Sequence, residues 1–256
     1  MIEEKPNSKK ERLPITDVNN FKAVAIFLIG LIGLNIIYNV IFIIVSLFIS
    51  LDPEINPDQF NSINGALQFA TYLIGLATIL MIIGIPTIKK IFEKYRISSV
   101  YINGIVMGIV LLFAQSLYSI LSTFIFGEID SNNNQQALIA LTQQSPILLF
   151  ITTVILAPVF EELVYRYGLF GLIHKKNRIL SYVICLIIFG FIHFDYTCIT
   201  SGDMNFIKTE LINLPAYMIS GGILCYSYEK NGSLISSITA HALNNLIAFI
   251  QIMILF

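Results

Sequence analysis

Long apolar runs alternate with short polar connections along most of the chain. The runs cover residues 23–51, 64–88, 98–126, 146–173, 179–198, 208–228 and 233–256. Each reaches about 20 residues, the length that an α-helix needs to cross roughly 30 Å of hydrocarbon. They do not alternate with the period of two that is typical of membrane-spanning strands. The pattern therefore predicts an all-α, polytopic bundle of about seven transmembrane helices.

Turn-forming and capping residues lie at the ends of these runs. They are Asn19-Asn20, Asp52-Pro53, Asn64-Gly65, Ser145-Pro146 and Asn231-Gly232. Ser145 and Pro146 predict a helix start, with a capping hydroxyl followed by proline at the first helical position. The sixth run is the least regular, because Lys208, Glu210 and Pro215 interrupt its first half.

The composition supports a membrane protein. Hydrophobic residues make up 56% of the chain and charged residues only 12%, whereas soluble domains carry about 25% charged residues. The net charge of −1 gives no sign of a nucleic-acid partner. Cys185, Cys198 and Cys225 are widely separated, which argues against a disulfide framework or a cysteine-rich zinc site.

Basic residues gather in alternate connections. Thirteen of the fifteen lie on one predicted side: Lys5, Lys9, Lys10, Arg12, Lys22, Lys89, Lys90, Lys94, Arg96, Lys175, Lys176, Arg178 and Lys230. Because positive loops stay inside, we expect the amino terminus in the cytoplasm and the bundle in the plasma membrane. His174, beside Lys175, is expected to be a solvated residue.

This orientation divides the chain into four parts. Residues 1–22 form a cytoplasmic tail, and residues 23–126 form the first three helices. Residues 127–145 form an external connection, which is either a short amphipathic helix at the interface or a loop. Residues 146–256 form the last four helices.

A few polar side chains interrupt the last four apolar runs. They are Glu161, Glu162 and Arg166 in the fourth run, His193 in the fifth, and His241 and Asn245 in the seventh. A helical rise of about 1.5 Å per residue puts them at overlapping depths. Because ionisable groups in a membrane usually face the bundle interior and carry function, we expect one buried polar layer.

The spacing within the helices assigns partners. Glu162 and Arg166 are one turn apart on one face, and so are His241 and Asn245. Glu161 points about 100° away from Glu162, so one glutamate can bind Arg166 while the other faces the histidines. A structural ion pair or a proton-relay transporter would also place charges here.

These motifs resemble one known family. Glu161-Glu162-xxx-Arg166, Phe189-xxx-His193 and His241-xxx-Asn245 are similar to the motifs of the CPBP family of intramembrane peptidases. That family includes CAAX prenyl proteases and bacteriocin-processing (Abi) proteins, and the resemblance covers residues 146–256. It implies an endopeptidase in which Glu161 and His193 activate a water while His241 and Asn245 hold the oxyanion. Glu162, Arg166 and Phe189 would support the site.

The resemblance leaves other features open. Zinc or another divalent metal on Glu161, His193 and His241 is one option, although water activation by a carboxylate and a histidine does not require it. The substrate is expected to be a prenylated CAAX-like tail, a bacteriocin or pheromone precursor, or a small membrane protein. The alternative is a non-catalytic bacteriocin self-immunity or scaffold protein of the same family.

Overall fold

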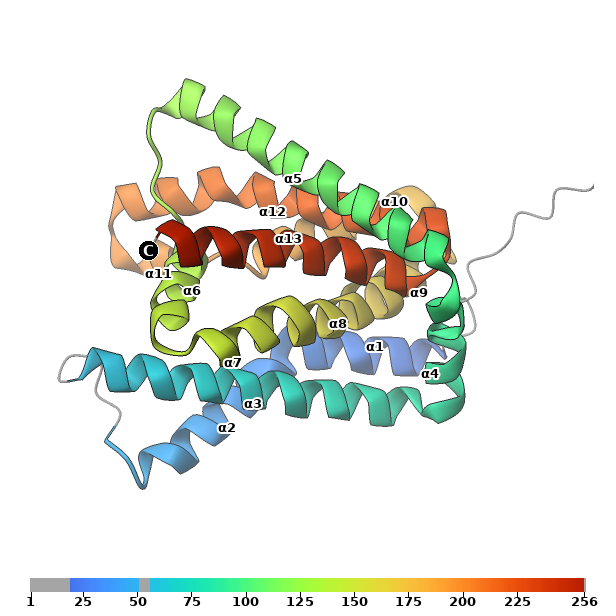
Figure 1. The fold of residues 1–256 in the computed structure, drawn as a ribbon, viewed down its shortest axis with the longest axis horizontal. Helices are drawn as coiled ribbons and strands as arrows, with labels where there is room; N and C mark the ends of the chain where they lie inside the picture. The colour runs from blue at the N-terminus through green and yellow to red at the C-terminus, as the bar shows by residue number, and fades with distance from the viewer. Residues whose placement is uncertain (1–18, 51–55, 256) are drawn as a thin grey trace, which may run out of the picture.

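The computed structural model describes residues 19–50 and 56–255, and every regular element within them is a helix (Figure 1). The elements are α1 (Asn20–Leu28), η1 (Ile29–Gly33), α2 (Leu34–Ser46), α3 (Pro57–Ile83), α4 (Ile85–Ile91), η2 (Glu93–Arg96), α5 (Ser98–Phe126), α6 (Asn133–Gln144), α7 (Pro146–Phe150), η3 (Ile151–Leu156), α8 (Ala157–Glu161), η4 (Glu162–Phe170), α9 (Gly171–His174), α10 (Arg178–Phe191), α11 (Thr197–Ser201), α12 (Met204–Asn231) and α13 (Leu234–Leu255). The all-α prediction is confirmed. Most of the tail 1–22 and the Asp52-Pro53 boundary lie outside the described residues.

Five helical stretches are long and apolar enough to cross a membrane. They are Asn20–Ser46, Pro57–Ile83, Ser98–Phe126, Pro146–His174 and Leu234–Leu255. Of the other two predicted spans, α10 has only 14 residues, and α12 has 28 residues but is interrupted by charges. The chain is a multi-pass membrane protein; its seven-span count and its orientation stay predictions.

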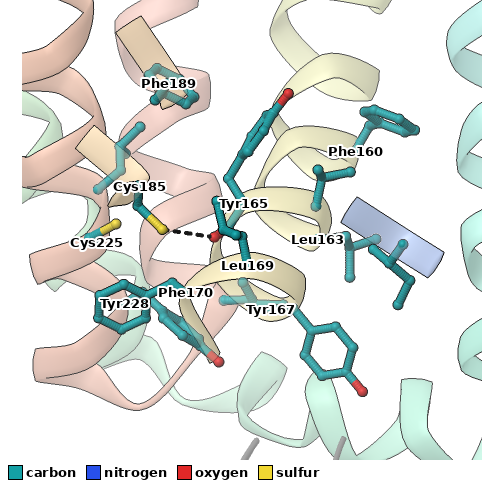
Figure 2. Close-up of a cluster of buried hydrophobic side chains, with 14 of the residues drawn as sticks. Phe160, Leu163, Tyr165, Tyr167, Leu169, Phe170, Cys185, Phe189, Cys225 and Tyr228 are labelled. Atoms are coloured by element: carbon teal, nitrogen blue, oxygen red, sulfur yellow. Dashed lines mark hydrogen bonds between the residues drawn. The ribbon is translucent and has the colours of Figure 1, made fainter. Parts of the chain in front are cut away.

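The fourth stretch, from α7 to α9, lies at the centre of the bundle. Its apolar window is 56% buried, against 28% or less in the other four stretches. In Figure 1 it runs between α1 and α3 on one side and α12 and α13 on the other. Figure 2 shows its buried side chains, with Leu163 facing α1 and Phe170 packed beside Tyr228 of α12. Phe160 packs on Tyr72 of α3. A helix enclosed in this way keeps polar side chains away from lipid.

Small residues bring α5 against α13. A Cβ atom added at Gly104 would lie 2.7 Å from the carbonyl oxygen of Ser236, and one at Gly108 would lie 2.9 Å from Leu243. This spacing of two glycines by four residues is the usual way in which membrane helices approach closely. The close contact closes the bundle beside the seventh predicted span.

The structure confirms some of the local predictions made from the sequence and corrects others. Asn19 caps α1 by accepting from the N–H of Phe21, and α7 begins at Pro146, as expected. The Ser145 hydroxyl, however, donates to the carbonyl of Ser62 in α3 instead of capping α7. His174 is not simply solvated, because its ring contacts Glu229 at 2.8 Å.

Candidate active site

The paired glutamates lie where α8 meets η4. Pro158 opens this region, and π-helical segments lie on both sides of it, η3 before and η4 after. Proline removes a backbone donor, and π-helical turns are frequent at functional sites because they change which face a side chain occupies. Glu161 and Glu162 accordingly point into different surroundings.

Glu162 is enclosed by protein. Its Oε1 lies 3.1 Å from Nη1 of Arg166 and 3.0 Å from Nδ1 of His241, and the residue has no exposed surface. Arg166 is equally buried, donates to the carbonyl of Gly221 at 3.2 Å and lies over the Phe189 ring at 4.5 Å. Through these contacts Glu162 links η4 to α13, and Arg166 links η4 to α12.

Glu161 has fewer partners. Tyr72 Oη of α3 lies 3.4 Å from its Oε1, and His241 Nε2 lies 3.9 Å from its Oε2. Among the described residues, no donor is within hydrogen-bonding distance of that second oxygen, although it is buried. One carboxylate oxygen of Glu161 is therefore free to accept from a bound molecule.

His193 follows the last turn of α10. Its Nδ1 lies 2.8 Å from the carbonyl of Phe189, and its ring stacks on Tyr217 with centroids 4.4 Å apart and planes 10° apart. A carbonyl can only accept, so Nδ1 carries the hydrogen; we assign this tautomer from the hydrogen bond. In the neutral ring Nε2 is then the basic atom.

Asn245 is oriented by its neighbours on η3 and α13. Its Nδ2 donates to the carbonyl of Thr153 at 2.8 Å, and its Oδ1 accepts from Asn244 at 3.4 Å. A carboxamide has two N–H donors, so this arrangement leaves one N–H for another acceptor.

One cavity of about 330 Å³ connects these residues. Its wall includes Glu161, His193, His241 and Asn245, together with residues of α6. This volume lies within the range of small-molecule and cofactor sites, about 300–1,000 Å³. The structure therefore brings the four expected catalytic residues to one cavity and leaves Glu162 and Arg166 behind its wall.

The comparisons with known proteins point to one family. A family model described as "Type II CAAX prenyl endopeptidase Rce1-like" matches residues 143–247. The putative membrane peptidase YdiL of Bacillus subtilis is 25% identical over 56% of this chain and 51% of its own length. The membrane-embedded CAAX protease MroQ of Staphylococcus aureus is 28% identical over 70% of each chain. Over residues 143–247 these matches support the CPBP family for this chain.

A further relative matches a shorter part of the chain. The UPF0177 protein YvdC of Lactococcus lactis is 32% identical over 42% of this chain, and the chain spans 42% of that protein. No solved structure matches the chain. The matched segment 143–247 contains all five motif residues that line the cavity, and it excludes Tyr72.

A metal site of the kind considered for CPBP proteins does not fit the observed geometry. Among the residues that the structure describes, no three His, Cys, Asp or Glu side chains are placed to hold a metal ion. The ligand set Glu161, His193 and His241 is therefore not assembled in the part of the chain that the structure describes.

Several CPBP site neighbours were not predicted from the sequence. They are Tyr72, Gln115 and Tyr217, which all line the cavity, and Glu162 as a partner of His241. The apolar run 98–126 contains two carboxamides, Asn103 near its start and Gln115 near its middle, and a carboxamide at mid-run is the kind of signal that could have identified Gln115. Tyr72 and Tyr217 have no such signal, because tyrosines are common in membrane helices.

Proposed function

We propose that this protein is an intramembrane endopeptidase that hydrolyses a peptide bond of a membrane-associated substrate. The observation that carries the proposal is the shared cavity, in which a carboxylate and two imidazoles meet inside an apolar bundle. Ionisable groups are costly at such a depth and are retained there for function. The printed names of two relatives, a putative membrane peptidase and a CAAX protease, support the same activity.

Glu161 is the general base in this proposal. Its free, buried oxygen can accept a proton from a water held in the cavity. As the water oxygen attacks the carbonyl carbon of the scissile amide, its proton passes to Glu161. The same carboxyl then returns a proton to the amine that leaves when the C–N bond breaks.

His193 binds the same water in this proposal. Its Nδ1 hydrogen is committed to the Phe189 carbonyl, so its Nε2 accepts from the water at the cavity wall. Stacking on Tyr217 fixes the plane of the ring. Glu161 and His193 come from different helices, which lets them reach one water from two directions.

His241 and Asn245 stabilise the charge that develops on the substrate oxygen. Glu162 accepts from Nδ1 of His241 and so orients the ring, whose other nitrogen, Nε2, lies on the side of Glu161. Asn245 supplies its second N–H from the same helix, one turn away. Glu162 and Arg166, with Phe189 beneath the guanidinium, hold the helices that carry these donors.

The substrate classes follow from the membrane location and the family. We include a prenylated CAAX-like tail, a bacteriocin or pheromone precursor, and a small membrane protein, all presented at the plasma membrane. Each delivers a peptide bond to the bilayer, which is where the cavity residues lie.

The test compares membrane peptides from cells that express wild type, Glu161→Gln or Glu128→Gln. Glu128 is exposed in the connection after α5, so its replacement is a chemically matched control. We expect mass spectrometry to find new peptide termini with wild type and the control, and none with Glu161→Gln. The same termini with all three proteins would favour the non-catalytic scaffold.

A further inference from the structure

Helix α6 forms one wall of the cavity. Asn134, Leu138 and Thr142 lie four residues apart on one helical face, and all three line the cavity. In Figure 1, α6 lies at the end of the bundle where α7 begins and α13 ends. The proposed active site is therefore closed at this end by a helix of the connection 127–145.

The carboxyl-terminal end of α6 is attached to α3. Gln144 Nε2 donates to Oδ1 of Asp58 at 2.8 Å, and the Ser145 hydroxyl donates to the carbonyl of Ser62. The helix α7 follows at once through Pro146. This end of α6 is therefore held by neighbouring helices on both sides.

The amino-terminal end of α6 depends on Glu210 of α12. Oε1 of Glu210 accepts from the backbone N–H of Asn133 at 2.9 Å, and Oε2 accepts from that of Asp195 at 3.1 Å. The glutamate is only 1% exposed. A buried carboxylate is very costly without such bonds, and the first turn of α6 adds a favourable helix dipole.

The two segments that Glu210 joins both contact His193 or its neighbours. Asp195 lies two residues after His193 and accepts from Nδ2 of Asn133 at 2.7 Å. Asn132 accepts from Oη of Tyr217 at 3.3 Å, and Tyr217 stacks on His193. Movement of the first turn of α6 would therefore displace the ring assigned to water activation.

We propose that Glu210 is a positioning residue that fastens α6 over the cavity and holds the His193 segment in place. α6 is then the cover beneath which a substrate peptide passes. The description of that peptide as a substrate rests on the proposed function, whereas the cover itself does not. Opening requires that the two backbone N–H groups leave Glu210 and that the side-chain contacts of Asn132 and Asn133 break with them.

Two independent changes remove the fastening. Glu210→Gln keeps the shape but replaces one acceptor oxygen with an N–H₂ group, which faces an N–H donor. Asn133→Pro removes the N–H itself, and proline suits this first helical position. Asn133→Ala keeps the N–H and removes only the side chain, so it is the matched control for the proline variant.

The readout is access of a charged thiol reagent to the cavity. Ala248, which lines it from α13, is replaced by cysteine after the cysteines at 185, 198 and 225 are changed to alanine. We expect labelling of purified protein to be roughly tenfold faster with Glu210→Gln or Asn133→Pro, because losing a hydrogen bond to a charged group favours local opening. Asn133→Ala and Glu128→Gln should label within about twofold of the parent, because both keep the Glu210 bonds.

A conservative variant separates positioning from general destabilisation. Glu210→Asp keeps the charge and both acceptor oxygens, so it should label more slowly than Glu210→Gln at a similar melting temperature. Equal labelling rates in the parent, Glu210→Gln and Asn133→Pro would overturn the proposal. So would labelling of Asn133→Ala as fast as Asn133→Pro, because the side chain would then be the fastening.

Labelling requires no cleavage, so the two proposals can fail separately. If Glu210→Gln is labelled faster but no variant cleaves, the proposal that α6 covers the cavity stands and the proposed peptidase activity is rejected. If wild type cleaves but Glu210→Gln is labelled no faster than the parent, the proposed peptidase activity stands and the proposal that α6 covers the cavity is rejected.

Discussion

Glu161 and Glu162 are neighbours in sequence but meet different surroundings. Glu162 is paired with Arg166 and His241 in the protein interior, whereas Glu161 faces the cavity with one oxygen free. The difference arises because adjacent helical residues point about 100° apart. The two carboxylates should therefore fail in different ways when they are changed.

Replacing Glu161 by Gln should abolish cleavage and leave the fold intact. Loss of a general base costs about 10²–10⁴-fold in rate. His241, which lies 3.9 Å from Glu161, keeps its shorter contact with Glu162 in this variant. Glu162→Gln should lose activity and also stability, by about 3–5 kcal/mol, because Arg166 stays buried without its counter-charge. Cleavage and detergent-solubilised melting temperature, measured together, distinguish them. Cleavage by Glu161→Gln together with an inactive, fully stable Glu162→Gln would reverse these roles.

Asn245 and Asn244 offer a second paired test. Asn245→Ala should lower kcat by about 10²–10³-fold, as expected for loss of one oxyanion donor. Asn244→Ala should have a smaller effect, since Asn244 donates to the Asn245 carboxamide and is not one of the proposed oxyanion donors. Single-turnover cleavage assays measure both. Equal, small effects would remove Asn245 from the proposed oxyanion site.

At the scale of elements, one acidic residue joins three helices at the predicted cytoplasmic end. Glu229, just beyond the apolar run 208–228, contacts His174 at 2.8 Å, Arg178 at 2.8 Å and Tyr182 at 2.6 Å. The hydrogen bond from Arg178 is the main reason that the pKa of Glu229 falls from 4.5 to about 2. The ionised carboxylate thus holds the ends of α9, α10 and α12 together.

This lowered pKa predicts a pH-dependent contribution to stability. Because the folded pKa lies below the unfolded value, the contribution is complete above about pH 4.5 and is lost as pH falls towards about 2. The melting temperature of Glu229→Gln should lie below wild type at pH 7, and the gap should narrow below pH 4.5. Exposed Glu93→Gln is the control and should follow wild type. A gap that is constant with pH would mean that the contact does not stabilise through charge.

At the scale of the whole molecule, the distribution of charge predicts the orientation in the membrane, and the packing of the helices encloses the cavity. Basic residues gather in alternate connections, which predicts that α6 and the start of α3 face outside. The cavity reaches from Glu161 to α6. If this orientation holds, the cover of the proposed active site is on the outer side of the membrane.

Cysteine labelling of intact cells tests the orientation. Ser62→Cys and Ala137→Cys, both at exposed positions, should react with an impermeant thiol reagent in a cysteine-free background. Exposed Lys176→Cys should react only after the membrane is permeabilised. The reverse pattern would invert the predicted topology and place α6 on the cytoplasmic side.

Local chemistry made much of the fold predictable from the sequence. Hydropathy and length predicted the helices and the membrane, because lipid forces backbone polar groups to pair within a helix. The i,i+4 spacing predicted the pair of Glu162 and Arg166, since residues one turn apart share a face. The motifs predicted the family, which the comparisons confirmed.

Contacts between distant segments were decided only by the tertiary structure. His241 turns to Glu162 as well as to Glu161, and α6 folds over the cavity on Glu210, a residue that the sequence marked only as an interruption of a span. The register of one helix against another depends on close packing and backbone N–H partners, which leave no periodic trace in either segment. The sequence alone therefore determined which residues are polar in the membrane, and packing decided which of them meet.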